Sequence, residues 1–321
     1  MGQAPVPALP VPMEQWLNHL KVNRRYSSHT LSGYRQDLRH LVPPESDVAL
    51  ERLTESHIRR TLARLHGQGL KPTSLARALA AWRGFFQWWA PMAGLDRNPV
   101  TGVRAPKAPR GLPKALSVEQ TQALLDRAGL PQPKTPVEWR DQAMFEMLYS
   151  SGLRLAELVS LDWRYTRAGS YESTSWVQLT EHEATVKGKG NKTRTVPVGS
   201  KAILAVNNWL ELREQFLQPD ATTDSQAALF LGTRGKRISP RVVELQLNKL
   251  VTLAGLPVHV HPHSLRHSFA SHVLQSAQDL RAVQELLGHA NISTTQIYTR
   301  LDFQHLAKVY DQAHPRANRK R

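Results

Sequence analysis

The sequence predicts a mainly helical protein of two domains, with a small mixed or antiparallel sheet in the second domain. Three observations support this prediction. The chain has 321 residues, enough for two domains of ordinary size. Apolar residues recur at helical spacing through most of the chain. The segments Thr185–Lys187 and Thr193–Val198 flank Gly-Lys-Gly-Asn, a pattern typical of a hairpin.

Residues 1–103 are predicted to form a wholly helical first domain. Its fourth helix, from about residue 73, has the clearest pattern. Apolar residues there are spaced by four, three, four and three positions, at Leu75, Leu79, Trp82, Phe86 and Trp89. The aromatic side chains could stack on nucleic-acid bases, but such regular spacing favours a place in the core.

A basic linker is predicted over residues 104–116, where three prolines and a glycine prevent a regular element. A plain flexible linker is an equally good interpretation. The second domain is then expected to cover residues 117–321.

Four local features of this second domain are predicted. Ser117 and Ser239 precede helical patterns and are expected to cap those helices. Residues 164–184 look irregular. The basic end of the chain, residues 316–321, is expected to be solvated and frayed.

The formal net charge of +16 and the isoelectric point near 10.4 predict a polyanionic partner, with nucleic acid ahead of a membrane surface. Lys and Arg outnumber Asp and Glu in both parts, by 16 to 7 in residues 1–110 and by 26 to 19 in residues 111–321. The absence of cysteine excludes disulfides, thiolate metal sites and a cysteine nucleophile. No signal peptide or membrane-spanning run is evident, so we expect a cytoplasmic protein without membrane insertion.

Six residues form a candidate catalytic set. They lie in the patterns S-G-L-R-L-A-E-L, G-K-G-N-K, H-S-L-R-H, L-L-G-H-A and T-T-Q-I-Y-T-R, at Arg154, Lys189, His263, Arg266, His289 and Tyr298. The arginine fork matches two phosphate oxygens, and a tyrosine can attack phosphorus. Such a set can transfer a phosphoryl group without a metal or another cofactor.

The arginines also have a structural interpretation. Arg266 and His263 are three residues apart, so they should share one helix face. Arg154 lies after a glycine turn at a helix start, but a purely structural ion pair with Glu157 would explain it equally well.

The lysine assignment is ambiguous from spacing alone. A lysine at a hairpin tip can protonate a leaving oxygen, and Lys189 lies at such a tip. Lys187 and Lys192 flank it and leave the choice open. A zinc site is disfavoured, because a proline interrupts the candidate ligands and no acidic residue adjoins them, at His259, His261, His263 and His267.

These motifs, in this order and spacing, resemble those of the tyrosine site-specific recombinases, the phage integrase family. Within that family the chain is similar to the bacterial Xer recombinases, above all to their XerC branch over residues 280–317. The resemblance covers nearly the whole chain. It implies a C-shaped DNA clamp of a helical SAM-like amino-terminal domain and a catalytic domain.

The resemblance also implies roles for the site residues. Tyr298 would attack the scissile phosphate and form a 3′-phosphotyrosyl link. Arg154 and Arg266 would hold the non-bridging oxygens, and Lys189 would protonate the leaving 5′ oxygen.

The remaining roles come from the same resemblance. His263 would exchange a proton with the tyrosine, His289 would bind the phosphate, and Glu157 would orient the site. The carboxyl-terminal helix would dock into a neighbouring subunit through an apolar face of Phe303, Leu306, Val309 and Tyr310.

The implied partners are double-stranded DNA with a dif-like site, a XerD-like recombinase in a heterotetramer, and an FtsK-type translocase as regulator. The implied task is resolution of chromosome dimers at cell division. A type IB topoisomerase and a non-catalytic DNA-binding protein are the alternative interpretations.

Several polar residues are candidates for DNA contact in the resembled fold, although a solvated helix face explains each equally well. They are His29, Thr30, Arg35, Lys71, Thr73, Arg77 and Arg241.

Overall fold

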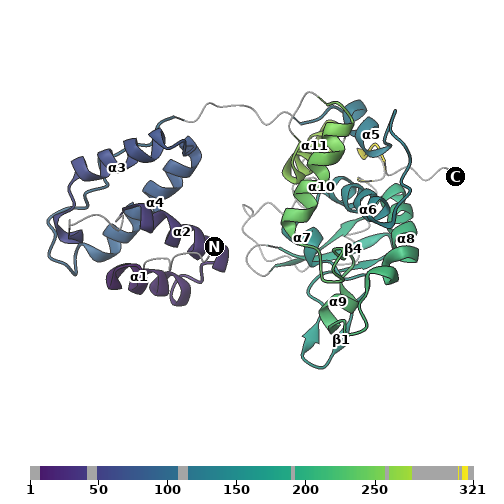
Figure 1. Ribbon diagram of the computed structural model, residues 1–321, viewed down its shortest axis with the longest axis horizontal. Helices are drawn as coiled ribbons and strands as arrows, with labels where there is room; N and C mark the ends of the chain where they lie inside the picture. The colour runs from purple at the N-terminus through teal and green to yellow at the C-terminus, as the bar shows by residue number, and fades with distance from the viewer. Residues whose placement is uncertain are drawn as a thin grey trace, which may run out of the picture. The chain divides into compact units, whose positions relative to one another are not determined.

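The chain divides into two compact units, Met1–Gly111 and Leu112–Arg321, in the computed structural model (Figure 1). Each unit has its own hydrophobic core. The structure describes residues 8–41, 49–107, 115–188, 192–256, 260–276, 310 and 313–316. The linker bounds 104–116 stay a prediction.

The first unit is helical among its described residues. Its elements are α1 (Val11–Val22), α2 (Ser28–Leu41), a short 3₁₀ helix (Leu50–Arg52), α3 (Glu55–Gly67) and α4 (Pro72–Trp89). The predicted stripe on α4 is buried, so its place in the core is confirmed. Trp82 is fully buried and donates its indole N–H to the Asp37 carbonyl at 2.7 Å.

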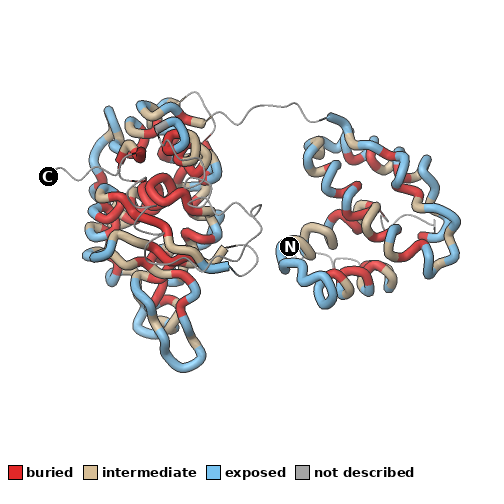
Figure 2. The backbone as a smooth tube through the Cα atoms, turned by 180° about the vertical axis from the view of Figure 1, so that it is seen from behind, coloured by how far each residue is buried: buried red, intermediate tan, exposed pale blue. Residues whose placement is uncertain are grey.

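The second unit is built around one long helix, α6 (Pro136–Ser150). Figure 1 shows it at the centre of the unit, and Figure 2 shows it buried along most of its length. The other helices of this unit are α5 (Val118–Leu125), α7 (Leu155–Ser160), α8 (Ser200–Arg213), a 3₁₀ turn (Glu214–Phe216), α9 (Thr223–Ala227), α10 (Pro240–Leu253) and α11 (Pro262–Ser276).

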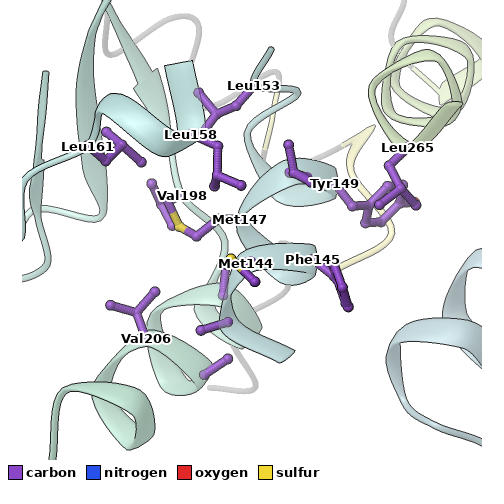
Figure 3. Packing of buried hydrophobic residues seen from close by; sticks show 14 of the residues in the cluster. Met144, Phe145, Met147, Tyr149, Leu153, Leu158, Leu161, Val198, Val206 and Leu265 are labelled. Carbon is purple, nitrogen blue, oxygen red and sulfur yellow. The ribbon is translucent and has the colours of Figure 1, made fainter. Parts of the chain in front are cut away.

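Side chains from several elements meet on α6. Met144, Met147 and Tyr149 pack with Leu158 of α7 and Leu265 of α11 in the core that Figure 3 shows. Removal of these apolar side chains from water is the main contribution to the stability of α6.

Both predicted caps are present. Ser117 accepts a hydrogen bond from the Gln120 N–H, and Ser239 accepts one from the Val242 N–H. These contacts satisfy donors that the first turn of a helix otherwise leaves open.

The predicted hairpin is confirmed. β3 (Trp176–Gln178), β4 (Glu183–Lys187) and β5 (Thr193–Pro197) form an antiparallel sheet in that order. Lys187 pairs with Thr193 at the closed end.

The prediction that residues 164–184 are irregular is wrong. This segment holds β3, the start of β4 and a small hairpin of β1 (Arg167–Ala168) and β2 (Tyr171–Glu172). The physical reason is the buried carboxylate of Asp162, which accepts hydrogen bonds from the hydroxyls of Tyr171 and Ser173. A polar segment thereby finds internal partners instead of water.

Two predictions about the carboxyl end also need correction. Tyr310 is 1% exposed in its own subunit, where its hydroxyl lies 2.8 Å from Ser150 Oγ, so it is not part of a partner-docking face. Arg316 is buried rather than solvated. Phe303, Leu306 and Val309 lie outside the described residues, and their docking stays a prediction.

Candidate active site

Glu157 lies at the centre of a cluster of arginines in the second unit. Its carboxylate, 3% exposed, accepts hydrogen bonds from the Arg154 backbone N–H at 2.8 Å and from Arg154 Nη1 at 2.9 Å. Arg194 donates to both carboxylate oxygens, at 2.7 and 2.9 Å. Arg266 Nη1 lies 4.0 Å away. Three guanidinium groups surround one carboxylate, which leaves a local positive excess for an anion.

The local sequence Arg-Leu-Ala-Glu explains how the side chains of Arg154 and Glu157 come together. Arg154 is the extended residue that precedes α7, and Glu157 is the third residue of that helix. A glutamate at this position can reach back to the N–H of the capping residue, which is what Glu157 does. The start of α7 therefore aligns both side chains at once.

Gly152 connects this helix start to α11. Its φ of +55° lies in the left-handed region, and a Cβ there would clash with the Phe269 ring. Its carbonyl accepts a hydrogen bond from Arg266 Nη1. The turn before Arg154 thus also holds Arg266.

The charges in this cluster perturb one another. Burial alone would raise the pKa of the Glu157 carboxyl, but the hydrogen bonds and charges of Arg194, then of Arg154, outweigh it and lower the pKa to about 2. Burial, followed by repulsion from Arg154, lowers the pKa of Arg266 to about 10. Near neutral pH, Glu157 is therefore ionised and Arg266 is still a cation.

Arg154, Arg266 and His263 line the same pocket, of about 320 Å³. Arg266 and His263 reach it from one face of α11, as their spacing of three residues predicts. Arg154 has a side chain 37% exposed and faces the pocket from α7. The remaining lining residues are Leu153, Leu155, Glu244, His261 and Pro262. Two arginines and a histidine on one open pocket suit a bound phosphate.

The profile of the phage integrase family matches residues 114–305, and that of the phage integrase amino-terminal SAM-like domain matches residues 13–90. The chain belongs to the phage integrase family. As a member of this family of tyrosine recombinases, it cleaves and rejoins DNA.

Curated integrase-family relatives match over nearly their full length. "Tyrosine recombinase XerC 1" of Ralstonia nicotianae is 53% identical over 322 residues, covering 99% of this chain and 97% of the relative. "Tyrosine recombinase XerC" of Pseudomonas aeruginosa is 46% identical over 311 residues, covering 96% of each.

Solved integrase-family structures show the same fold. The XerH recombinase bound to palindromic difH substrate gives a TM-score of 0.64 at 22% identity, covering 93% of this chain and 84% of that one. The Tn1549 transposon integrase with a circular intermediate DNA gives 0.69 at 15% identity, covering 92% and 98%.

Four of the site residues predicted from the sequence lie together in the structure: Arg154, Glu157, His263 and Arg266. Lys189, His289 and Tyr298 lie outside the described residues. The roles of all seven residues stay predictions.

Sequence reasoning missed Arg194 of β5, which belongs to this integrase-family site through Glu157. Arg194 is the second residue of β5, in a strand otherwise composed of threonine, valine and proline. A lone arginine in such a strand pattern was the available signal.

The DNA-contact candidates fall into two groups. Arg77 is bound bidentately by buried Asp37, at 2.8 and 3.0 Å, and Arg35 is paired with Glu14. Arg241 is likewise paired, with Glu244 at 3.6 Å. The second group has exposed or half-exposed side chains, at His29, Thr30, Lys71 and Thr73. Contact with DNA stays a prediction for all seven.

Neither a membrane span nor a metal cluster is found in the described part of the chain. None of its helices is both long and apolar enough to cross a membrane. No group of three His, Asp or Glu side chains there could hold a metal ion.

We expect Gly152→Ala to destabilise the protein by more than about 1 kcal/mol, because alanine is strained at this φ and its methyl group meets Phe269. DNA cleavage should also slow, since the Gly152 carbonyl holds Arg266. Thermal unfolding and a cleavage assay check the two effects. Gly255→Ala is the matched control, with φ of +62° and open space around it. Equal effects of both variants on cleavage would contradict the proposed link to Arg266.

Proposed function

We propose that the chain is a Xer-type site-specific recombinase that cuts DNA through a 3′-phosphotyrosyl intermediate on Tyr298. The observation that carries this proposal is the pocket shared by Arg154, Arg266 and His263. A phosphodiester under attack gathers negative charge on its non-bridging oxygens. Fixed guanidinium groups stabilise that charge without reorganising during the reaction.

The role of each group follows from its chemistry. Arg154 and Arg266 hold the two non-bridging oxygens, and Glu157 keeps Arg154 aligned for them. His263, on the same pocket, exchanges a proton with the attacking phenol. The phenol of Tyr298 needs such help, because a tyrosine ordinarily has a pKa near 10.

The other two groups complete the reaction. Lys189 protonates the leaving 5′ oxygen, and His289 donates a hydrogen bond to the phosphate. The Tyr298–phosphate ester conserves the energy of the broken phosphodiester bond. Rejoining therefore needs neither ATP nor another cofactor.

The biological setting that we propose is the resolution of chromosome dimers. The support is that relatives up to 53% identical over nearly the whole chain are XerC recombinases. The chain would act in the cytoplasm on double-stranded DNA with a dif-like site. It would form a heterotetramer with a XerD-like recombinase under an FtsK-type translocase.

A plasmid with two directly repeated dif-like sites tests this proposal. We expect the chain and a XerD-like recombinase together to resolve it into two circles. Mutating either site should stop the reaction. Relaxation of supercoils by the chain alone, without site preference, would instead indicate a topoisomerase.

A further inference from the structure

Arg194 connects the β4–β5 hairpin, whose turn segment holds Lys189, with α7, which begins directly after Arg154. It lies on β5, paired in register with Val186 of β4, and its side chain is 10% exposed. Both of its terminal nitrogens donate to Glu157, which belongs to α7. A bidentate pair of this kind fixes direction as well as distance. The β4–β5 hairpin is thereby bound to the helix that begins at Arg154.

The base of the hairpin turn lies directly on this ion pair. A Cβ on Gly188 would be 3.2 Å from Arg194 Nη1 and 3.4 Å from Glu157 Oε1, closer than most side-chain contacts. The Gly188 N–H donates to the Lys192 carbonyl at 2.8 Å and closes the turn. A larger residue at position 188 would therefore crowd the ion pair.

Arg194 does not line the pocket that Arg154, Arg266 and His263 share. Its side chain is therefore placed to orient other residues rather than to bind the phosphate. Along the chain, Arg194 follows Lys192, whose carbonyl accepts from the Gly188 N–H at the base of the segment that holds Lys189. We propose that Arg194 is a positioning residue that fixes the base of the β4–β5 hairpin, at Gly188 and Lys192, against α7 through Glu157, so that leaving-group protonation by Lys189 is aligned with the arginine pocket.

This inference rests on the proposed function. In cleavage, the bond from Tyr298 Oη to phosphorus forms and the bond from phosphorus to the 5′ oxygen breaks. The phenol proton passes to a base, and a lysine proton passes to the 5′ oxygen. Arg194 is therefore expected to affect the transfer of the lysine proton to the 5′ oxygen. A general acid contributes about 10²–10⁴-fold to such a rate, and misplacing it should forfeit about 10- to 100-fold.

A substrate that needs no acid separates this role from a general structural one. In a 5′-bridging phosphorothiolate, sulfur replaces the leaving 5′ oxygen. A thiol ionises near pH 8.5, so a thiolate leaves without taking a proton. The measurement is the rate of covalent complex formation on the oxygen and sulfur substrates, for full-length wild type and Arg194→Gln. The ratio of the two rates within one variant does not depend on how much protein is folded.

We expect Arg194→Gln to be slowed about 10- to 100-fold on the oxygen substrate and to approach the wild-type rate on the sulfur substrate. Its affinity for uncleaved DNA should stay within about threefold of wild type. Arg194→Lys, which keeps one donor for Glu157, should show a smaller defect of the same kind. An equal defect on both substrates, or no defect, would overturn the assignment.

Arg237→Gln is the matched control. Arg237 is also largely covered, with its side chain 19% exposed; it binds Asp162 at 2.7 Å and donates to the Val159 and Leu161 carbonyls at the other end of α7. Its loss should lower stability without changing the ratio of the two rates. If wild type forms no covalent complex on either substrate, the proposed function fails. If wild type does and Arg194→Gln matches it, only this inference fails.

Discussion

Replacing Arg266 with glutamine is expected to slow formation of the covalent DNA complex by about 100- to 1,000-fold. Removing one fixed donor from a site that stabilises developing charge has this order of effect, about 2.7–4 kcal/mol. The fold should survive, because Glu157 keeps both hydrogen bonds from Arg194 and those from Arg154. Single-turnover cleavage of a nicked substrate measures the rate, and circular dichroism reports the fold.

Arg213→Gln provides the control for losing a buried arginine. Burial lowers the pKa of Arg213 to about 10, as it does for Arg266. Arg213, however, donates only to backbone carbonyls, at Ser225, Gln226 and Ala228. We expect this variant to lose stability and to cleave at the wild-type rate once folded. Similar cleavage defects in Arg213→Gln and Arg266→Gln would contradict a specific role of Arg266 in stabilising the phosphate charge.

Replacing Arg316 with methionine is expected to cost about 3–5 kcal/mol of stability, because it leaves the buried Glu146 carboxylate without its cation. The Arg316 guanidinium, 2% exposed, binds Glu146 with two nitrogens and Asp126 at 3.0 Å. For a unit of about 200 residues, this corresponds to a melting temperature lower by roughly 6–20 °C. Thermal unfolding of the full-length chain checks it.

The pH dependence of this variant is a second part of the same prediction. Burial raises the pKa of the Glu146 carboxyl, and the charge of Arg316 opposes that rise. Without Arg316 the pKa should rise further, so the folded state gains from a proton there. The loss of stability should be largest at high pH, where Glu146 must be ionised in both states, and should shrink as pH falls through the raised pKa of the folded state toward the ordinary carboxyl value of about 4.3.

A double variant separates the ion pair from other effects at Arg316. Adding Glu146→Gln to Arg316→Met removes the stranded charge and should recover most of the stability. Asp126 still has Lys201 as a partner at 2.9 Å in either variant. An unchanged melting temperature in the single variant would show that the chain end contributes little to the fold.

Local patterns account for the features that the sequence predicted well. The stripe on α4 and the caps at Ser117 and Ser239 depend on neighbours within one or two helical turns. The hairpin at residues 185–198 depends on the glycines of its own turn. The meeting of His263 and Arg266 on one pocket follows from helical spacing. In each case the interacting residues are close in sequence.

The features that sequence reasoning missed depend on distant partners. Arg194 and Glu157 are 37 positions apart, and Arg316 and Glu146 are 170 apart. A terminal arginine looks solvated until the fold supplies a buried carboxylate. The order in residues 164–184 likewise depends on Asp162, whose burial no local pattern announces. Tertiary contacts override local preference at these sites.

Tyr298 is proposed to cut DNA without a metal. The most direct test of this proposal is a nicked substrate with a dif-like core, incubated with the full-length chain and a XerD-like recombinase in EDTA and resolved on a denaturing gel. We expect a covalent protein–DNA band that disappears with Tyr298→Phe, while that variant still binds the DNA. A band that persists in Tyr298→Phe, or that forms only when a divalent metal is restored, would contradict it.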